Sequence, residues 1–188
     1  AGEPNPSKLV AGDELLLTVK ALDAFDNQVV DEKLSVFLEA DVTPVLDDSL
    51  STAAQRPREP PQRYMLQLRE GQASQRVPTR VAGELSLKMV QPSLPTIEHG
   101  GSARVKVVAG KASSVDVLNI PEAGQAGQAF ELVCLARDAY GNVDETFEKE
   151  VTIDYDGGAM PGGDKLTMPN DGVINLKKGM ARVRVGRA

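Results

Sequence analysis

Apolar and polar residues alternate along most of this chain with a period of two. The segments Leu15–Ala21 and Phe130–Ala136 both carry an apolar residue at every second position. Successive side chains of a β-strand point to opposite faces, so this pattern predicts strands with one face toward a core. No segment shows the apolar period of about 3.6 residues that indicates a helix. The same reasoning predicts further strands at Leu34–Ala40, Arg63–Leu68, Gln72–Val77, Gly83–Val90, Ala103–Ala109, Ser113–Ile120, Lys149–Tyr155, Lys165–Met168, Val173–Leu176 and Met180–Val185.

Two stretches of the chain repeat each other in sequence. The segment Ala11–Asn27 matches Ala126–Asn142 at an offset of 115 residues, with seven of 17 positions identical. A second block, Leu68–Val77, matches Leu176–Val185 at an offset of 108. The first copy therefore holds seven additional residues (115 minus 108). We place them in the proline-rich segment Asp47–Arg63 as an irregular surface loop, because proline cannot donate to a strand ladder.

Short motifs recur at matching places in the two copies. In the second copy an AG-x-x-F strand (Ala126–Phe130) runs into a D-x-x-GN corner (Asp138–Asn142). This combination resembles the start of filamin-type and bacterial-type immunoglobulin-like repeats. In the first copy, Gly83–Val90 is similar to the sixth strand of that family, and Ile97–Val107 is similar to its last strand, with one extra residue and without the usual Pro-Phe pair. The resemblance covers most of the chain and implies an all-β fold of tandem immunoglobulin-like β-sandwiches with Greek-key connections.

This resemblance also implies a division into domains. The boundary falls near Gly110, giving one repeat at residues 1–109 and a second at residues 110–188. The first copy begins just after the place of its first strand, and the second copy ends after its fifth. We therefore expect the second sandwich to be truncated. Two alternatives stay open: Ala1–Val10 supplies a short first strand, or a neighbouring chain fills the gap in the second copy, because open sheet edges attract strands.

Composition narrows the classes of function. The chain has 188 residues, 41% hydrophobic and 4% aromatic, with a formal net charge of -6. An excess of acidic residues argues against a nucleic-acid or anionic-membrane partner, which clustered Lys and Arg would attract. No apolar run reaches the roughly 18 residues of a membrane span. The single cysteine excludes an internal disulfide framework, and the single histidine excludes a histidine-cluster metal site.

The Asp-x-x-x-Asn corner is the first candidate for chemistry. Turn formation explains it, because Asp accepts local backbone N–H groups and Asn tolerates a positive φ. The alternative is calcium binding, which needs six to eight oxygen ligands. The acidic neighbours do not align between the copies, so we expect no metal and no cofactor. The calcium candidates are Asp23, Asp26, Asp138 and Asp144, with Asp31, Glu32 and Glu145 as additional oxygen donors.

Three other features have a structural and a chemical interpretation. Cys134 occupies the place of Val19 in a core-facing row, so we expect an inert buried thiol. His99 has no nucleophile motif nearby, which argues against catalysis. Asp154 and Asp156 lie on one face of a predicted strand rather than across a cleft, so they do not form a glycosidase pair. A basic group near the end of the chain is expected to form a solvated face rather than a site for an acidic partner. Its members are Lys177, Lys178, Arg182, Arg184 and Arg187.

The family resemblance implies a non-enzymatic function. We expect a structural and interaction module of a larger multi-repeat protein, acting as a spacer and protein-docking scaffold. In filamin-type domains a partner peptide adds a strand to a sheet edge. By this resemblance the partner-binding residues would be Val36, Leu38, Val151 and Ile153.

Two other classes of protein stay open, a cell-surface adhesin with or without calcium and an accessory module of a larger enzyme. The expected partners are proteins or neighbouring repeats, including self-association through open sheet edges. The lack of a disulfide, and the blocking of the Asn5–Ser7 glycosylation signal by Pro6, suit an intracellular protein or a prokaryotic-style surface and disfavour an ordinary secreted animal domain. The location stays open, with a cytoplasmic or cytoskeletal one slightly favoured over the cell surface.

Overall fold

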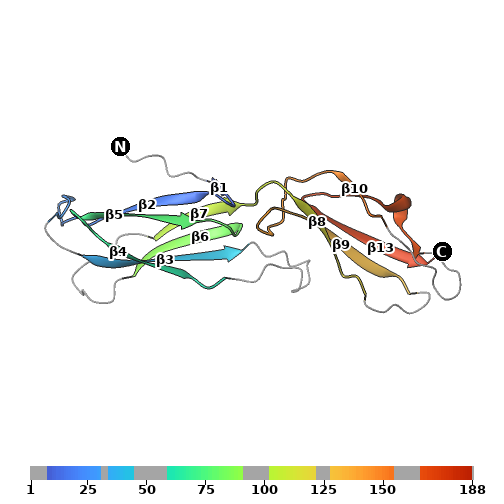
Figure 1. Cartoon of the computed structure of the whole chain (residues 1–188), viewed down its shortest axis with the longest axis horizontal. Helices are drawn as coiled ribbons and strands as arrows, with labels where there is room; N and C mark the ends of the chain where they lie inside the picture. Colours follow the sequence, from blue (N-terminus) through green and yellow to red (C-terminus); the bar gives the residue numbers. More distant parts are fainter. Residues whose placement is uncertain are drawn as a thin grey trace. The chain divides into compact units, whose positions relative to one another are not determined.

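Strands make up nearly all the regular structure of this chain. The computed structural model describes residues 8–30, 34–44, 59–90, 102–121, 128–154 and 166–187. Within these ranges the chain forms several β-sheets, none closed into a barrel, and no α-helix, so the predicted all-β class is confirmed. The chain divides into two compact units, Ala1–Val108 and Ala109–Ala188 (Figure 1).

The first unit contains a five-stranded and a two-stranded sheet. The five-stranded sheet has the order β1-β7-β6-β3-β4, and β2 pairs with β5 in the other. The strands are β1 (Lys8–Val10), β2 (Glu14–Lys20), β3 (Ser35–Pro44), β4 (Gln62–Gln67), β5 (Gln72–Pro78), β6 (Gly83–Val90) and β7 (Ser102–Val108). Strand β1 runs parallel to β7, with Leu9 opposite Val107. The segment Ala1–Val10 therefore supplies a short strand, which is one of the two alternatives that the sequence left open.

Both sheets of the first unit contribute side chains to one aliphatic core. In β6 the residues alternate as expected, because Leu85 and Leu87 are buried while Glu84 and Lys88 are exposed. The core cluster comprises Leu9, Ala11, Leu15, Val36, Leu38, Ala40, Leu66, Leu68, Val77, Leu85, Leu87, Val105 and Val107. Every strand of the first unit, including β5 through Val77, contributes at least one aliphatic side chain to this cluster. The burial of these side chains holds the two sheets together.

The second unit also has two sheets. One has the order β11-β13-β9-β8, and the other pairs β10 with β12. The elements are β8 (Ser114–Leu118), β9 (Phe130–Arg137), β10 (Glu150–Thr152), β11 (Leu166–Thr167), the 3-10 helix η2 (Pro169–Gly172), β12 (Val173–Asn175) and β13 (Met180–Arg187). Its core cluster comprises Leu132, Cys134, Ala136, Ile174, Leu176, Val183 and Val185.

Strand pairing in the two units follows the same register at the two sequence offsets. In the first unit Leu15 lies opposite Val77, and in the second Phe130 lies opposite Val185, which are the positions 115 and 108 residues later. The pair Val36 and Leu66 has its counterpart in Val151 and Ile174 at the same two offsets. Each unit therefore places its two repeated sequence blocks against each other in the same way.

Strand β9 differs from the alternating pattern. Leu132, Cys134 and Ala136 belong to the core cluster, as predicted for one core-facing row. The residues between them, Val133 and Leu135, are also buried, with exposed fractions of 2% and 0%. The sequence pattern predicted a single buried face, whereas this strand is buried on both.

Candidate functional site

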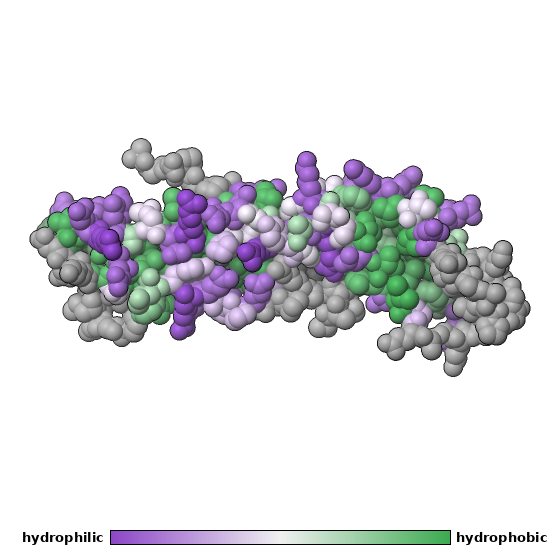
Figure 2. Space-filling view, viewed as in Figure 1, coloured by the Kyte–Doolittle hydropathy of each residue, from purple (hydrophilic) through white to green (hydrophobic). Residues whose placement is uncertain are grey.

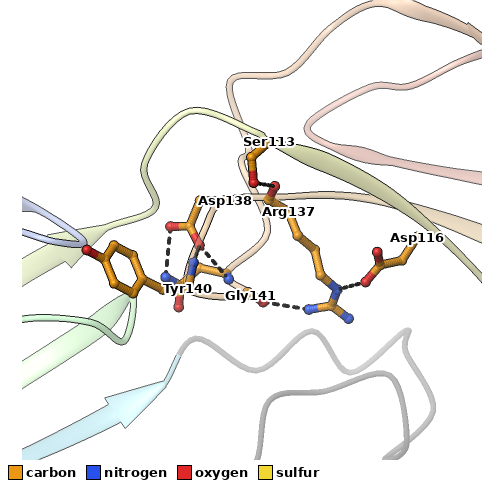
Figure 3. A network of polar contacts seen from close by, with 7 residues as sticks. Ser113, Asp116, Arg137, Asp138, Tyr140 and Gly141 are labelled. Atoms are coloured by element: carbon orange, nitrogen blue, oxygen red, sulfur yellow. Dashed lines mark hydrogen bonds and ion pairs between the residues drawn. The ribbon is translucent and has the colours of Figure 1, made fainter.

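The corner after β9 is organised around the carboxylate of Asp138. Its Oδ1 accepts hydrogen bonds from the backbone N–H groups of Tyr140 (2.8 Å) and Asn142 (2.9 Å). Its Oδ2 accepts one from Nδ2 of Asn142 (2.8 Å) and one from the backbone N–H of Gly110 (2.8 Å). Four donors thus saturate a buried carboxylate, and Figure 3 shows how Asp138 faces the backbone of its own turn. The positive φ of Gly141 (83°) lets the turn close.

A second carboxylate, Asp144, continues this arrangement. Its Oδ2 accepts the backbone N–H of Ala112 (2.9 Å), and its Oδ1 accepts the backbone N–H of Thr146 (2.9 Å) and the hydroxyl of Thr146 (2.6 Å). Both aspartates are 4–5% exposed. Together they hold the segment from Gly110 to Ala112 by its backbone at the start of the second unit. The residue pattern does not indicate the contacts with Gly110 and Ala112, because their donors are backbone N–H groups, which leave no side-chain signal.

Hydrogen bonding sets the ionisation of both carboxyl groups. Burial raises the pKa of Asp138, but the hydrogen bonds from Asn142, Gly110 and Tyr140 outweigh it and hold the pKa below its ordinary value. For Asp144 burial likewise raises the pKa, and the bonds from Thr146 and Ala112 lower it further than burial raises it. Bonds to N–H and O–H donors favour the charged form of a carboxylate. Both groups are therefore anionic at neutral pH.

An ion pair reinforces the same region. Nε of Arg137 lies 2.9 Å from a carboxylate oxygen of Asp116 in β8, and Nη1 of Arg137 donates to the carbonyl of Gly141 (2.7 Å). The backbone N–H of Ser113 donates to the carbonyl of Arg137 (2.7 Å), and the Ser113 hydroxyl lies 3.4 Å from the same oxygen. In Figure 3 the Arg137 side chain extends from the corner to Asp116. Side-chain and backbone contacts thus join β8 to the end of β9.

The first unit carries the same corner without a covering segment among the described residues. Oδ1 of Asp23 accepts the backbone N–H groups of Phe25 (2.8 Å) and Asn27 (2.9 Å), and Oδ2 accepts Nδ2 of Asn27 (3.1 Å). These bonds, that from the Asn27 side chain first, lower the pKa of Asp23. The corner is exposed, and the Phe25 side chain retains 85% of its accessible surface.

The calcium candidates do not converge on one site within the described residues. Oxygens of Asp23, Asp138 and Asp144 accept the N–H bonds given above, which is the turn chemistry considered from the sequence. Asp26 has a positive φ of 63° in its turn, and Glu145 is exposed. No group of three or more His, Cys, Asp and Glu residues capable of holding a metal ion occurs in the described part of the chain. Asp31 and Glu32 lie outside the described residues.

The four predicted partner-binding residues lie in strands with different neighbours. Val36 and Leu38 are buried (8% and 3% exposed) in β3, which is flanked by β4 on one side and β6 on the other. The ladder with β6 begins at Phe37, so Leu38 has a neighbour on both edges of β3, whereas Val36 pairs with Leu66 of β4. Val151 and Ile153 are half-buried at β10, which pairs with β12 alone among the described strands.

The remaining predicted features divide between the described and undescribed parts of the chain. Cys134 is a fully buried free thiol, and burial raises its pKa, in agreement with the expected inert core residue. Arg182 pairs with Glu131 at 2.7 Å on an exposed face of β13, and Arg184 is exposed nearby. Asp154 is exposed, whereas His99 and Asp156 lie outside the described residues.

Comparisons with other proteins do not assign this chain to a family or a function. Neither family models, nor curated proteins, nor solved structures give a significant match to this chain. In the described part of the chain, no helix has the length and apolar character needed to cross a membrane. The features that remain for function are the two aspartate corners and the sheet edges beside them.

Proposed function

We propose that this chain is a non-enzymatic interaction module of two related immunoglobulin-like β-sandwiches, which docks protein partners by adding a strand to β10. The shared register of the two units at offsets of 115 and 108 residues supports their relationship. The AG-x-x-F and D-x-x-GN motifs support the family. In this proposal the units also act as spacers between binding sites in a longer array of repeats.

The observation that carries the proposal is the unequal pairing of two corresponding strands. Strand β3 of the first unit has a neighbour on each edge, β4 and β6. Its counterpart in the second unit, β10, has only β12 among the described strands. A strand edge with unpaired N–H and C=O groups is a template for another strand. In the described part of the chain, no strand of the second unit lies at the position where the first unit places β6.

The hydrogen-bond pattern shows which backbone groups of β10 face this edge. The backbone N–H of Ile153 donates to Gly172, and the carbonyl of Lys149 accepts from Leu176, both on the β12 side. Antiparallel pairing alternates along a strand, so residues 149, 151 and 153 bond toward β12. The backbone groups of Glu150 and Thr152 therefore point to the opposite edge, where an added strand would bind.

The side chains indicate the chemistry of the partner strand. Val151 and Ile153 pack against the core cluster of the second unit but remain half-buried. In the first unit, Met89 of β6 lies opposite Leu38, the counterpart of Ile153, and packs half-buried against the core cluster. A partner with apolar residues at every second position would extend the second core in the same way. Figure 2 shows apolar surface on the second unit, consistent with a protein-binding role.

A proline substitution can test the proposal without removing the β10–β12 ladder. The probe is a labelled peptide with the sequence of residues 82–91, which contains β6. Thr152→Pro removes an N–H group from the open edge, where proline is tolerated, and Thr152→Val is the matched control that retains it. We expect the wild-type chain and Thr152→Val to bind the peptide, and Thr152→Pro to lose binding, measured by fluorescence anisotropy. Equal peptide binding by both folded variants, or none by the wild-type chain at millimolar peptide, would refute this mode of docking.

A further inference from the structure

The solvent face of the five-stranded sheet in the first unit carries a row of apolar side chains. Phe37 of β3 lies opposite Met65 of β4 and opposite Val90 of β6, and these three strands are neighbours (Figure 1). The flanking residues Val36 and Leu38 belong to the core cluster, so Phe37 points to the opposite face of the sheet. Met65 is 60% exposed and Val90 36%, while Phe37 between them is half-buried. Exposed apolar side chains gathered beside an aromatic residue are typical of protein-binding surfaces.

Charged side chains form the next row of the same face. Glu39 lies opposite Arg63 in β4 and opposite Lys88 in β6. Nε of Arg63 lies 2.8 Å from Oε2 of Glu39, and the Arg63 side chain is 69% exposed, compared with 21% for Glu39. Lys88 is also exposed. The charge that this row presents to solvent is therefore positive, although the whole chain has a formal net charge of -6.

The second unit has a corresponding surface at the sequence offsets of 115 and 108 residues. The counterparts of Phe37 and Met65 are Thr152 in β10 and Val173 in β12, which also lie opposite each other. Thr152 is exposed, and Val173 is 38% exposed. An apolar side chain is thus accessible at the same place in both units, whereas the central aromatic residue of the first unit is replaced by threonine.

The charge of this surface is reversed in the second unit. Asp154 and Asp171 are the counterparts of Glu39 and Arg63, and both are exposed. Glu150 is exposed on the same side of β10 as Asp154, because alternate residues of a strand share a face. Where the first unit presents positive charge to solvent, the second unit presents carboxylates.

We propose that the first of these surfaces binds the second in another copy of the chain, which gives head-to-tail association between copies. In this contact Val173 packs against the apolar row, and the carboxylates beside it face the exposed cations. Opposite charges across an interface steer association and favour one orientation. We call the first surface the basic face (Phe37, Arg63, Met65, Lys88 and Val90) and the second the acidic face (Glu150, Asp154, Asp171 and Val173).

The composition of the two faces sets the strength and the form of association. Three apolar side chains with a charged rim make a patch below the size of a standard protein interface, so the association is weak and reversible. Salt weakens it, because the charges on both faces are exposed. The two faces differ, so the contact is heterologous and each pair of copies keeps one free face of each kind. We expect sedimentation velocity of the full chain up to about 1 mM to show a growing fraction of dimers and larger species, which falls when salt is raised.

Two double variants separate the contributions of the faces. Met65→Gln with Lys88→Gln changes the basic face, and Val173→Gln with Asp171→Asn changes the acidic face. Each variant alone should associate about tenfold more weakly than the wild-type chain. An equimolar mixture of the two should recover the wild-type affinity and stop at a 1:1 complex, because each variant keeps one intact face.

The matched control changes an equally exposed apolar residue and a lysine in another strand. Leu16 in β2 is 59% exposed and Lys20 in the same strand is exposed, so Leu16→Gln with Lys20→Gln should associate like the wild-type chain. A wild-type chain that stays monomeric at about 1 mM would overturn the proposal. Equal weakening in the control, a mixture no stronger than the single variants, or undiminished association of the acidic-face variant alone would do the same. The peptide test of β10 measures binding at a strand edge, so failure here leaves the proposed function standing.

Discussion

The backbone N–H of Gly110 donates a hydrogen bond of 2.8 Å to Oδ2 of Asp138, which joins the start of the second unit to the corner after β9. Asp138 is 4% exposed and accepts three other hydrogen bonds from its own turn. The equivalent Asp23 has the three bonds of the turn and an exposed side chain. Asp138 and Asp23 are thus identical residues at equivalent corners. Gly110 covers the first corner, and no described segment covers the second.

This comparison predicts unequal effects of alanine at the two corners. Asp138→Ala removes the acceptor of four donors in a buried place, so we expect the second unit to lose about 2–4 kcal/mol of unfolding free energy. Labelling of Cys134 with a thiol reagent under denaturant measures that loss, because this cysteine is buried in the second unit. Asp23→Ala is the matched control and should leave labelling of Cys134 unchanged. A similar change in both variants would contradict the distinction.

The low pKa of both buried aspartates predicts loss of stability in acid. Hydrogen bonds hold the folded-state pKa of Asp138 and Asp144 below the ordinary value of about 3.9, so the unfolded chain binds more protons as pH falls. Their contribution to stability is complete above the ordinary pKa and is lost as pH drops through the lower folded values. We expect unfolding free energy, measured by denaturant titration with circular dichroism, to fall below about pH 4.

The control for this acid effect is the double variant Asp138→Asn and Asp144→Asn. It should be less stable at neutral pH, because the charged acceptors are gone. Its unfolding free energy should also change less between pH 6 and pH 3 than that of the wild-type chain. An unchanged pH slope would show that other carboxyl groups account for the acid sensitivity.

A substitution at Gly179, which directly precedes β13, is predicted to destabilise the second unit. Gly179 has a φ of +72°, and a Cβ atom there would lie 2.3 Å from the carbonyl oxygen of Asp144. Gly71, its counterpart in the first unit, has a φ of +73° and a similar approach to Val29. Gly179→Ala should destabilise the second unit by about 1–3 kcal/mol. Gly186→Ala is the control, since its Cβ would meet no atom within 4 Å, and it should have little effect in the same Cys134 labelling assay.

The buried thiol gives a prediction of its own. Cys134 is 0% exposed and its pKa is raised by burial, so the native chain should not react with a thiol reagent at neutral pH. Reaction should follow only unfolding of the second unit. Cys134→Ser places a hydroxyl in an apolar cluster and should cost about 1–3 kcal/mol. Rapid labelling of the native chain would show that β9 is accessible and would contradict this account of the core.

Part of this structure could be predicted from residue patterns alone. Alternation located β6 at Gly83–Val90 with the correct ends, and the repeat placed Leu15 and Phe130 at matching positions in their ladders. The predicted core-facing row of β9 is confirmed at Leu132, Cys134 and Ala136, but the opposite face is also buried at Val133 and Leu135, which the alternation did not indicate. Alternation identifies a strand with one polar face, but it gives no information about which neighbours cover the other face.

The aspartate corners show the same limit. The Asp and Asn of each corner could be recognised as turn chemistry because their bonds join residues two to four positions apart. The contact between Asp138 and Gly110 spans 28 positions and uses a backbone N–H that every non-proline residue has. No pattern of side chains could have predicted it.

Local chemistry in the sequence determined where the strands and turns of this protein lie, because side-chain periodicity and turn propensity act over a few residues. Which strands pair was decided by long-range contacts, since β3 and β10 have related sequences but, among the described strands, β3 pairs with β4 and β6 whereas β10 pairs with β12. The same holds for β2 and β9. Hydrogen bonding between strands depends on which segments meet in space, and that is a property of the assembled sheets.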